Sequence, residues 1–191
     1  MNFPAIYLAS SSPRRRELLT QIGVTFSVLA VDIDETRLKD ESAENYVQRV
    51  AILKAQTGWA RLEQNQQKPV LGSDTSVVLN KQVLGKPQSK IDARMMLQQL
   101  SGREHQVMTA VAMVTEKEIK CRLKTSVVCF REMTENEIDW YVSTGEGMDK
   151  AGGYAVQGLA AIFISELRGS YSAVMGLPLM ETGLLLEEVS E

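Results

Sequence analysis

The hydrophobic positions of this chain change their spacing several times, between the alternation of a strand and the three-to-four residue spacing of a helix. In residues 91–100, for example, Ala93, Met96, Leu97 and Leu100 follow the helical spacing. We expect strands at residues 5–9, 25–31, 105–114, 118–130 and 161–166, a hairpin within residues 69–87 that turns near Asn80 and Lys81, and helices at residues 13–22, 42–63, 91–100, after 134 and at 178–188.

Residues typical of helix ends support these boundaries. Pro13 suits the first turn of a helix, where its missing N–H costs nothing, and Gly23 suits the position after the last turn. Ser42 can cap the next helix, and Thr134 with Glu137 forms a capping-box signature. Because helices alternate with strands and a hairpin is also present, the pattern predicts an α/β fold with a mixed sheet covered by helices.

Composition narrows the class of protein. The chain has 191 residues, which suits one domain or two small lobes that share a core. Hydrophobic residues make up 44% and charged residues 24%, ordinary values for a soluble globular protein. The sequence has no apolar run long enough to span a bilayer, and its first residues lack the features of a signal peptide. We therefore expect a cytoplasmic protein without a membrane partner, and the net charge of −3 argues against direct nucleic-acid binding.

Several kinds of catalytic site are excluded by the residues available. The sequence has no Walker A, GxSxG or HExxH motif, and His105 is its one histidine. A histidine-based triad or a zinc site with several histidines would therefore need a second subunit. We interpret His105 as a structural residue at the start of a strand, and Cys121 and Cys129 as reduced, packed thiols.

Arginines stand where the first helix should bury an apolar face. Arg15 precedes Leu18, Leu19 and Ile22 by three, four and seven residues, so it shares their face, and Arg14 is four residues before Leu18. A helix N-terminus disfavours cations but attracts anions through its free N–H groups. The serines just before Pro13, including Ser10, add hydroxyl donors. The segment therefore predicts either a phosphate site or, equally well, arginines with buried stems and solvated heads.

A lysine and several acids show the same anomaly. Lys54 continues the stripe of Val47 and Val50 in the second helix, where it could snorkel to solvent or neutralise a ligand. Asp74 interrupts an apolar strand, and a buried carboxylate needs a cation or a metal as its partner. Gly72 just before it would allow a ligand or another backbone to approach closely. Further candidates are Lys86 in "LGKP" and the acids Asp32, Asp34 and Glu35 in "VDIDE".

Motifs along the whole chain resemble those of the Maf-type nucleotide pyrophosphatases. The segments "ASSSPRRRELL", "DIDE", "AILKA", "GSDTSVV", "LGKP", "LSGREHQVMTAV", "DKAGGYAVQG" and "GSYSAVMGLPL" occur in the order of that family. The resemblance implies a single Maf-like domain over residues 1–191. Its α/β fold would have an elongated mixed β-sheet flanked by helices, with two lobes and a central cleft, as in inosine-triphosphate pyrophosphatases.

The resemblance also implies an activity and its residues. The family cleaves nucleoside triphosphates to the monophosphate and pyrophosphate with a divalent metal cation, Mg²⁺ or Mn²⁺. Carried over to this sequence, Asp74 would be the catalytic base, and Glu35 and Asp74 the metal ligands. The residues that would bind or select the substrate are Ser10, Arg14, Arg15, Lys54, Thr75, Lys86 and Gln157.

Two positions indicate the subgroup that acts on dTTP and UTP. That subgroup has Arg at the position of Arg14 and Gln at that of Gln157, where the subgroup for 7-methyl-GTP has Trp and Glu. A glutamine amide offers both a donor and an acceptor, which match the edge of thymine or uracil. One departure from the family is Ser73, where relatives usually have Ala, and its hydroxyl could reach Asp74.

Two other functions stay open from the sequence. A non-catalytic nucleotide-binding regulator of septum formation would keep the cations but need no base, and the family has been linked to cell division arrest. A nucleic-acid-binding regulator is disfavoured by the pI of about 5.4 and by the lack of interleaved aromatic residues. Relatives also suggest a homodimer.

Overall fold

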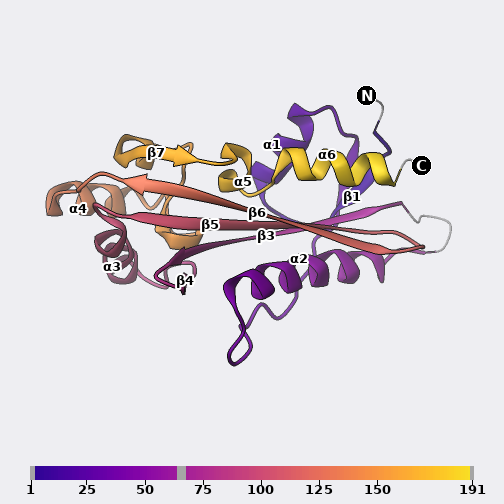
Figure 1. The fold of residues 1–191 in the computed structure, drawn as a ribbon, viewed down its shortest axis with the longest axis horizontal. Coiled ribbons are helices and arrows are strands. Elements are labelled where there is room, and N and C mark those ends of the chain that lie inside the picture. The colour runs from indigo at the N-terminus through magenta and orange to yellow at the C-terminus, as the bar shows by residue number, and fades with distance from the viewer. Residues whose placement is uncertain (1–2, 64–67, 190–191) are drawn as a thin grey trace. The chain divides into compact units, whose positions relative to one another are not determined.

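The computed structural model describes residues 3–63 and 68–189, which form alternating helices and strands (Figure 1). The helices are α1 (Pro13–Gln21), α2 (Ala43–Trp59), α3 (Lys90–Leu100), α4 (Glu135–Thr144), α5 (Tyr171–Met175) and α6 (Leu179–Glu188). The strands are β1 (Ile6–Leu8), β2 (Phe26–Val28), β3 (Val70–Leu79), β4 (Gln82–Leu84), β5 (Glu104–Val114), β6 (Ile119–Phe130) and β7 (Ile164–Arg168). Two short 3₁₀ helices, η2 (Ala151–Gly153) and η3 (Leu159–Phe163), complete the described elements.

The end signals of the sequence act as expected. Pro13 begins α1, and the chain leaves this helix through Gly23 with a positive φ of 72°. The Ser42 side chain accepts a hydrogen bond from Asn45 N at the start of α2. Thr134 and Glu137 form both bonds of a capping box on α4. These local predictions are confirmed. They could be made from the sequence because each depends on backbone geometry within one turn.

The hairpin prediction is also confirmed, and its turn lies at the predicted residues. Asn80 and Lys81 both have positive φ, 51° and 68°, as the two central residues of a type I′ turn require. Val77, Val78 and Leu79 of β3 then pair in antiparallel fashion with Leu84, Val83 and Gln82 of β4.

Several boundary predictions were wrong, and one short helix was missed. The strand expected at residues 25–31 spans only Phe26–Val28. Helix α2 ends at Trp59 rather than near residue 63. The segment 161–166 starts as 3₁₀ helix and becomes strand only at Ile164, since its short apolar run has no clear period. The five-residue helix α5 was not predicted, because one turn and a half shows too little periodicity.

The sheet is mixed, as predicted. Among the described residues its strand order is β2-β1-β3-β5-β6-β7, with β4 also paired to β3. Strand β1 runs parallel to β2 and β3, whereas β6 and β7 are antiparallel. The predicted α/β fold with a mixed sheet flanked by helices is therefore confirmed. Within the described ranges no helix is long and apolar enough to cross a membrane.

The chain divides into two compact units, which we call the first unit and the second unit. The first unit contains the described residues of Met1–Asp74, Thr109–Lys124 and Gly176–Glu191. The second unit contains Thr75–Met108 and Thr125–Met175. Whether the two form a single domain stays a prediction.

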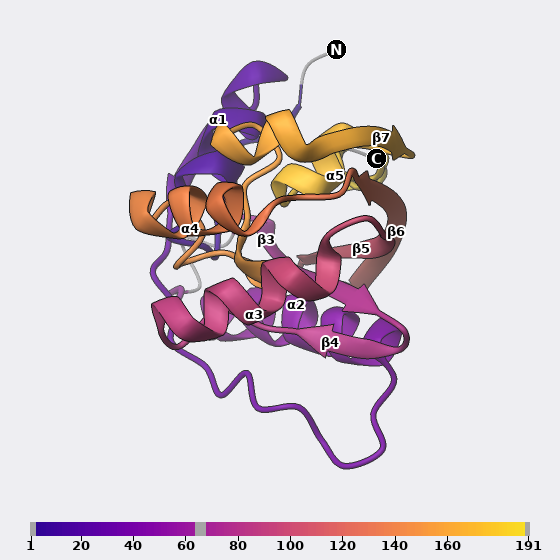
Figure 2. The same ribbon diagram turned by 90° about the vertical axis from the view of Figure 1, so that its left-hand side faces the viewer.

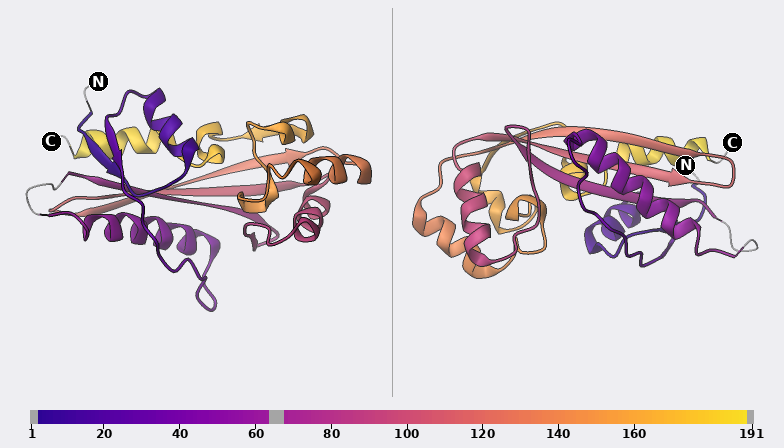
Figure 3. Two further views of the ribbon diagram at one scale, coloured as in Figure 1. Left: turned by 180° about the vertical axis from the view of Figure 1, so that it is seen from behind. Right: turned by 90° about the horizontal axis from the view of Figure 1, so that it is seen from below.

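In the first unit, α2 and α6 cover opposite faces of the strands (Figure 3). Helix α2 packs on the sheet through Val47, Val50, Ala51 and Ala55, all fully buried. Its small residues permit a very close approach to β3. A Cβ atom added to Gly72 would lie 2.4 Å from Ala51 O and 2.7 Å from Ala55 N. Gly72 thus lets the backbone of β3 lie against that of α2, as the sequence suggested.

The second unit has its own core, in which α3 contacts α4 (Figure 2). Aromatic rings pack edge to face at its centre: the centroids of Phe130 and Tyr154 are 4.9 Å apart, and those of Tyr141 and Phe163 are 6.0 Å apart. Tyr141 and Phe163 are almost fully buried. These rings fix α4 and the segment after η2 to one another.

The close approach at Gly72 can be tested with one methyl group. We expect Gly72→Ala to lower the free energy of unfolding by about 3 kcal/mol, because the new Cβ would displace the backbone of α2. Urea denaturation measures the change. The matched control is Gly183→Ala in the middle of α6, where a Cβ would meet no atom within 4 Å. The control should gain up to about 1 kcal/mol from helix propensity, and equal stabilities of the two variants would contradict the prediction.

Candidate active site

Five of the residues selected from the sequence lie in the first unit around one lysine. Ser10 follows β1, Arg15 lies in the first turn of α1, and Glu35 lies in the long segment between β2 and α2. Lys54 projects from the fourth turn of α2, and Asp74 is the last residue of β3 within this unit.

Lys54 connects the two acids. Its Nζ lies 2.8 Å from Asp74 Oδ1 and 2.8 Å from Glu35 Oε1. The side chains of Lys54 and Asp74 are only 12% and 9% exposed, whereas that of Glu35 is 42% exposed. Lys54 therefore does not snorkel to solvent as a lone lysine would. It is held in a buried ion pair, and Glu35 reaches it from the solvent side.

The position of Lys54 follows from the packing of α2. Ala51 and Ala55 flank Lys54 within one turn and lie against Gly72, two residues before Asp74. Because side chains alternate along a strand, Gly72 and Asp74 point to the same face of β3. The close approach of α2 therefore brings Lys54 to Asp74.

Arg15 is held by oxygen atoms from two other parts of the first unit. Its Nε donates to the carbonyl oxygen of Gly176 at 2.9 Å, and its Nη1 donates to Ser10 Oγ at 3.1 Å. Ser10 Oγ also accepts from Ser12 N at 3.2 Å. Ser10 is buried and Arg15 half-buried. The anion-site prediction for this helix start thus has an oriented guanidinium and hydroxyl at its centre.

Ser73 takes part in the same framework but not as expected. Its hydroxyl is fully buried and makes its hydrogen bonds to carbonyl oxygens, 2.8 Å from Ala110 O and 3.0 Å from Gly176 O. The suggested bond to Asp74 is not among them, because neighbouring side chains of a strand point to opposite faces. Ser73 instead fixes Gly176, whose carbonyl also orients Arg15. Sequence reasoning missed this role of Gly176, since a backbone carbonyl carries no residue signal.

Electrostatics raise the basicity of Asp74. Burial raises the pKa of its carboxyl above the usual value of 3.8, and Lys54 and Arg15 only partly oppose this effect. Burial lowers the pKa of Arg15, while Asp74 and Glu35 raise it. Burial together with the charges of Asp74 and Glu35 raises the pKa of the Tyr46 phenol to about 12.

A clasp on α2 holds the segment that carries Glu35. Arg49 binds Glu41 with two hydrogen bonds, Nε to Oε1 at 2.7 Å and Nη2 to Oε2 at 2.9 Å. Arg49 Nη2 also donates to the carbonyl oxygen of Thr36 at 3.1 Å, directly after Glu35. The bond to Arg49 lowers the pKa of Glu41 to about 2, so the clasp is charged at neutral pH. Arg49 could not be predicted from the sequence. Arginines on helices are usually solvated, so its presence alone indicates no contact.

The structure leaves four of the selected residues outside this set. Arg14 is half-buried on α1, beside Arg15 in the chain. Thr75 follows Asp74 in β3 and belongs to the second unit, as do Lys86 after β4 and Gln157 before η3. Lys86 and Gln157 are exposed, and Gly152 N donates to Gly85 O at 3.0 Å beside Lys86. The roles of these four residues stay predictions.

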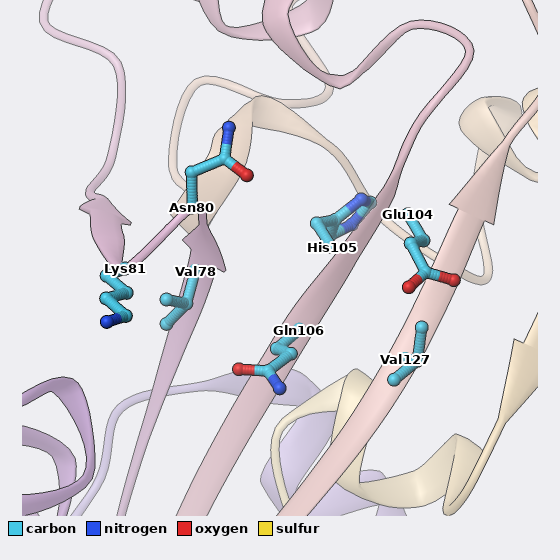
Figure 4. A pocket seen from close by; sticks show the side chains of 7 residues that line it. All are labelled: Val78, Asn80, Lys81, Glu104, His105, Gln106 and Val127. Carbon is cyan, nitrogen blue, oxygen red and sulfur yellow. The ribbon is translucent and has the colours of Figure 1, made fainter.

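His105 lies at a shallow hollow in the second unit. Figure 4 shows its lining, formed by Val78, Asn80, Lys81, Glu104, His105, Gln106 and Val127. The ring of His105 is buried against Phe130 and Tyr154, and its Nε2 is 2.7 Å from Tyr154 Oη. Burial lowers the pKa of His105 to about 4, so the ring is neutral at pH 7. These contacts agree with the structural role expected for His105.

The acids of the site suit a hard divalent cation with few protein ligands. In the described residues no group of three or more His, Cys, Asp or Glu side chains gathers. Glu35 and Asp74, however, both lie within 2.8 Å of one ammonium group, so a single cation can contact both. Mg²⁺ usually takes one or two carboxylates together with waters and substrate phosphates. The donor set therefore fits Mg²⁺ or Mn²⁺ and not a closed zinc site.

Comparisons with known proteins found a matching family model, similar sequences and a similar solved structure. The family model described as Maf-like protein matches residues 5–189. The dTTP/UTP pyrophosphatase of Pseudoalteromonas atlantica is 51% identical over 97% of this chain and 97% of the relative. That of Saccharophagus degradans is 54% identical over 97% of this chain and 89% of the relative. Among solved structures, the Ham1 protein of Staphylococcus aureus aligns with a TM-score of 0.48 and 20% identity, over 66% of this chain and 71% of that one.

The raised pKa of Asp74 has a consequence for stability. Between the unfolded pKa of 3.8 and the higher folded pKa, the folded protein binds more protons than the unfolded chain, so stability falls as pH rises through this window. Asp74→Asn removes this loss. We expect the free energy of unfolding of Asp74→Asn, relative to that of the original protein, to be more favourable at pH 7 than below pH 3.8.

Urea denaturation over this pH range measures the difference, with Asp34→Asn as the control of opposite sign. Hydrogen bonds from Thr36 lower the pKa of Asp34, so the stability contributed by Asp34 is present above its unfolded value of 3.8 and lost as pH falls. The relative stability of Asp34→Asn should therefore decline as pH rises. A decline for Asp74→Asn as well would show that burial does not dominate at Asp74.

Proposed function

This chain belongs to the family of Maf-like proteins, and on that basis we propose that it is a nucleoside triphosphate pyrophosphatase acting on dTTP and UTP. The reaction releases the nucleoside monophosphate and pyrophosphate, which makes the protein a hydrolase of acid anhydrides. The single observation that supports this most is the buried Lys54 paired with Asp74 and Glu35 in the first unit. A site that only bound nucleotides would have no need of a buried carboxylate beside its cations.

Glu35 and Asp74 are the residues that would hold a divalent metal, Mg²⁺ or Mn²⁺. Such an ion would neutralise phosphate oxygens and lower the pKa of the attacking water. Lys54 already contacts both carboxylates, so it would share them with the cation and keep them oriented. Because Glu35 is the more exposed of the two acids, it can adjust its position when the substrate arrives.

Asp74 would take the proton from the attacking water. Burial raises the pKa of its carboxyl in the site without metal. When Glu35 and Asp74 hold the cation, the lowered pKa of the attacking water is what would allow Asp74 to accept its proton. Oxygen from the water then bonds to the α-phosphorus, the bond from that phosphorus to the bridging oxygen breaks, and pyrophosphate leaves with the electron pair. The proton remains on Asp74 until it passes to solvent.

The cations of the site would stabilise the leaving pyrophosphate. Arg15 presents a guanidinium that is already oriented by Ser10 and Gly176, and the N-terminus of α1 adds free N–H groups. Lys54 and Lys86 would add point charges. Preorganised charges of this kind act more strongly in a partly buried site than in water.

Base selection is assigned to residues outside the reacting centre. Gln157 would pair its amide with the C=O and N–H edge of thymine or uracil. Thr75 and Arg14 would contact the base or sugar end of the nucleotide. We further propose that the protein works in the cytoplasm as a single two-lobed domain and forms a homodimer. Modified pyrimidine nucleotides would be further substrates.

Catalysis is tested with purified protein, dTTP and Mg²⁺, by measuring pyrophosphate release. Asp74→Asn should lose most activity, and Lys54→Ala should lose about a hundredfold in kcat, roughly 3 kcal/mol of transition-state stabilisation. The exposed Lys117→Ala serves as the matched control and should keep its activity. Normal turnover of dTTP by a folded Asp74→Asn variant would contradict the proposal. Binding of dTTP by the original protein without release of pyrophosphate would also contradict it, and would favour a nucleotide-binding regulator.

Specificity is tested at Gln157. Glutamate at this position keeps the size but loses the amide donor, so Gln157→Glu should lower kcat/KM for dTTP and UTP by about tenfold or more relative to GTP. Initial rates with a panel of nucleoside triphosphates measure this ratio. Unchanged relative rates would remove Gln157 from the specificity site while leaving the catalytic assignment intact.

A further inference from the structure

The segment that carries Gln157 is a tight turn in the second unit, between a buried stretch and the 3₁₀ helix η3. Gly158 N donates to Ala155 O at 3.1 Å, so Val156 and Gln157 occupy the centre of the turn. Tyr154, Ala155 and Val156 are buried, whereas Gln157 is exposed. The turn therefore presents one polar side chain on a fixed backbone, and the orientation of Gln157 depends on what holds residues 155–159.

The carboxylate of Glu146 holds this turn at both of its ends. Both of its oxygens accept from Leu159 N at 3.0 Å. Oε2 also accepts from the hydroxyl of Tyr141 at 2.9 Å, and that hydroxyl oxygen accepts from Ala155 N at 3.2 Å. Glu146 thus reaches Leu159 directly and Ala155 through Tyr141, and these two residues lie two positions to either side of Gln157.

Steric contacts show that the carboxylate lies directly against the turn. A Cβ atom added to Gly158 would lie 2.2 Å from Glu146 Oε1 and 2.5 Å from its Oε2. Glycine is therefore required next to Gln157 for Glu146 to reach Leu159. Glu146 itself follows Gly145, which ends α4 with a φ of 73°. Tyr141, the intermediate group, is 1% exposed and packs against Phe163, so its hydroxyl has little freedom.

We propose that Glu146, acting with Tyr141, is a positioning residue that sets the nucleotide selectivity of the protein by fixing the turn that presents Gln157. The inference rests on the proposed function, because it requires Gln157 to read the base. Glu146 would not touch the substrate. Its effect reaches the nucleotide through the backbone of residues 155–159.

The chemistry of the contacts explains why a carboxylate stands there. Every group that Glu146 meets in these bonds is a donor: Leu159 N–H on both of its oxygens and the Tyr141 hydroxyl on Oε2. A carboxylate accepts on both oxygens and donates on neither. Glutamine would turn one oxygen into an amino group, which would face the Leu159 N–H or the Tyr141 hydroxyl as donor against donor. The glutamine variant should consequently be intermediate between the original protein and alanine.

Steady-state kinetics with dTTP, UTP, CTP and GTP test the proposal on Glu146→Ala, Glu146→Gln and Tyr141→Phe. We expect KM for dTTP and UTP to rise about tenfold in Glu146→Ala and the preference over CTP and GTP to shrink, while kcat changes less than about threefold. The glutamine variant and Tyr141→Phe should shift in the same direction by less. The latter two variants preserve side-chain volume and keep the test decisive if the alanine variant does not fold.

The matched control is Glu137→Ala on α4, the helix that carries Tyr141. Glu137 also accepts several hydrogen bonds, from Thr134 N at 2.8 Å and from Arg131 Nη2 at 2.7 Å, but it caps α4 and does not contact the turn. This variant should lose stability without any change in selectivity. If the variants of Glu146 and Tyr141 behave like the control, losing thermal stability but not selectivity, their role is structural alone and the proposal is wrong.

Gln157→Ala separates this inference from the function on which it rests. Support requires that Gln157→Ala shifts selectivity and that adding Glu146→Ala to it causes no further shift. A shift in Gln157→Ala without one in Glu146→Ala would overturn the inference and leave the assignment of Gln157 standing. If Glu146→Ala shifts selectivity but Gln157→Ala does not, Glu146 acts by another route and the inference is also overturned.

Discussion

The ammonium group of Lys54 must stay within reach of Asp74, because a buried carboxylate without a cation would be strongly disfavoured. This one ion pair explains several features of the first unit. Gly72 and the alanines of α2 allow the two backbones to approach closely enough for the pair to form. Burial still outweighs the attraction, since the pKa of Asp74 remains above its usual value. Without metal the fold thus holds a carboxylate that is more basic than it would be in water, which is a cost in stability.

Around this pair, most orientation is supplied by backbone oxygens and by residues that do no chemistry. The Gly176 carbonyl receives hydrogen bonds from both Arg15 and Ser73. The Arg49–Glu41 clasp holds the backbone just after Glu35. Glu35 lies in a segment without regular secondary structure, so it would otherwise be free to leave Lys54. The charged side chains of the site are therefore held by further contacts. No sequence motif marks the residues that make these contacts.

The difference between the charged side chains and the residues that orient them explains which features could be predicted from the sequence. Helix and hairpin ends were predictable because Pro13, Ser42 and the Asn80–Lys81 turn act within a few residues. Lys54 and Asp74 could be selected because charges interrupt apolar patterns, but their pairing could not, since it depends on how closely α2 packs on β3. Arg49 and Glu146 were missed for a different reason. Each is an ordinary charged residue in sequence, and only its contacts with the backbone of another segment distinguish it.

Glutamates in the two units illustrate what such contacts require. Glu41 and Glu146 both act on backbone N–H groups: Glu41 accepts from Leu38 N at 3.1 Å and Glu146 from Leu159 N at 3.0 Å. Glu41 is also neutralised by Arg49, and the two side chains are only 8% and 29% exposed. The Glu146 carboxylate accepts instead from neutral donors, the Tyr141 hydroxyl and Leu159 N, and Gly158 allows it to lie against the turn. Glu146 therefore bears on recognition only through the backbone of the turn, because it contacts Leu159 directly and Ala155 through Tyr141 and not the base itself. A contact of this kind needs two acceptor oxygens and a close approach, and no opposite charge.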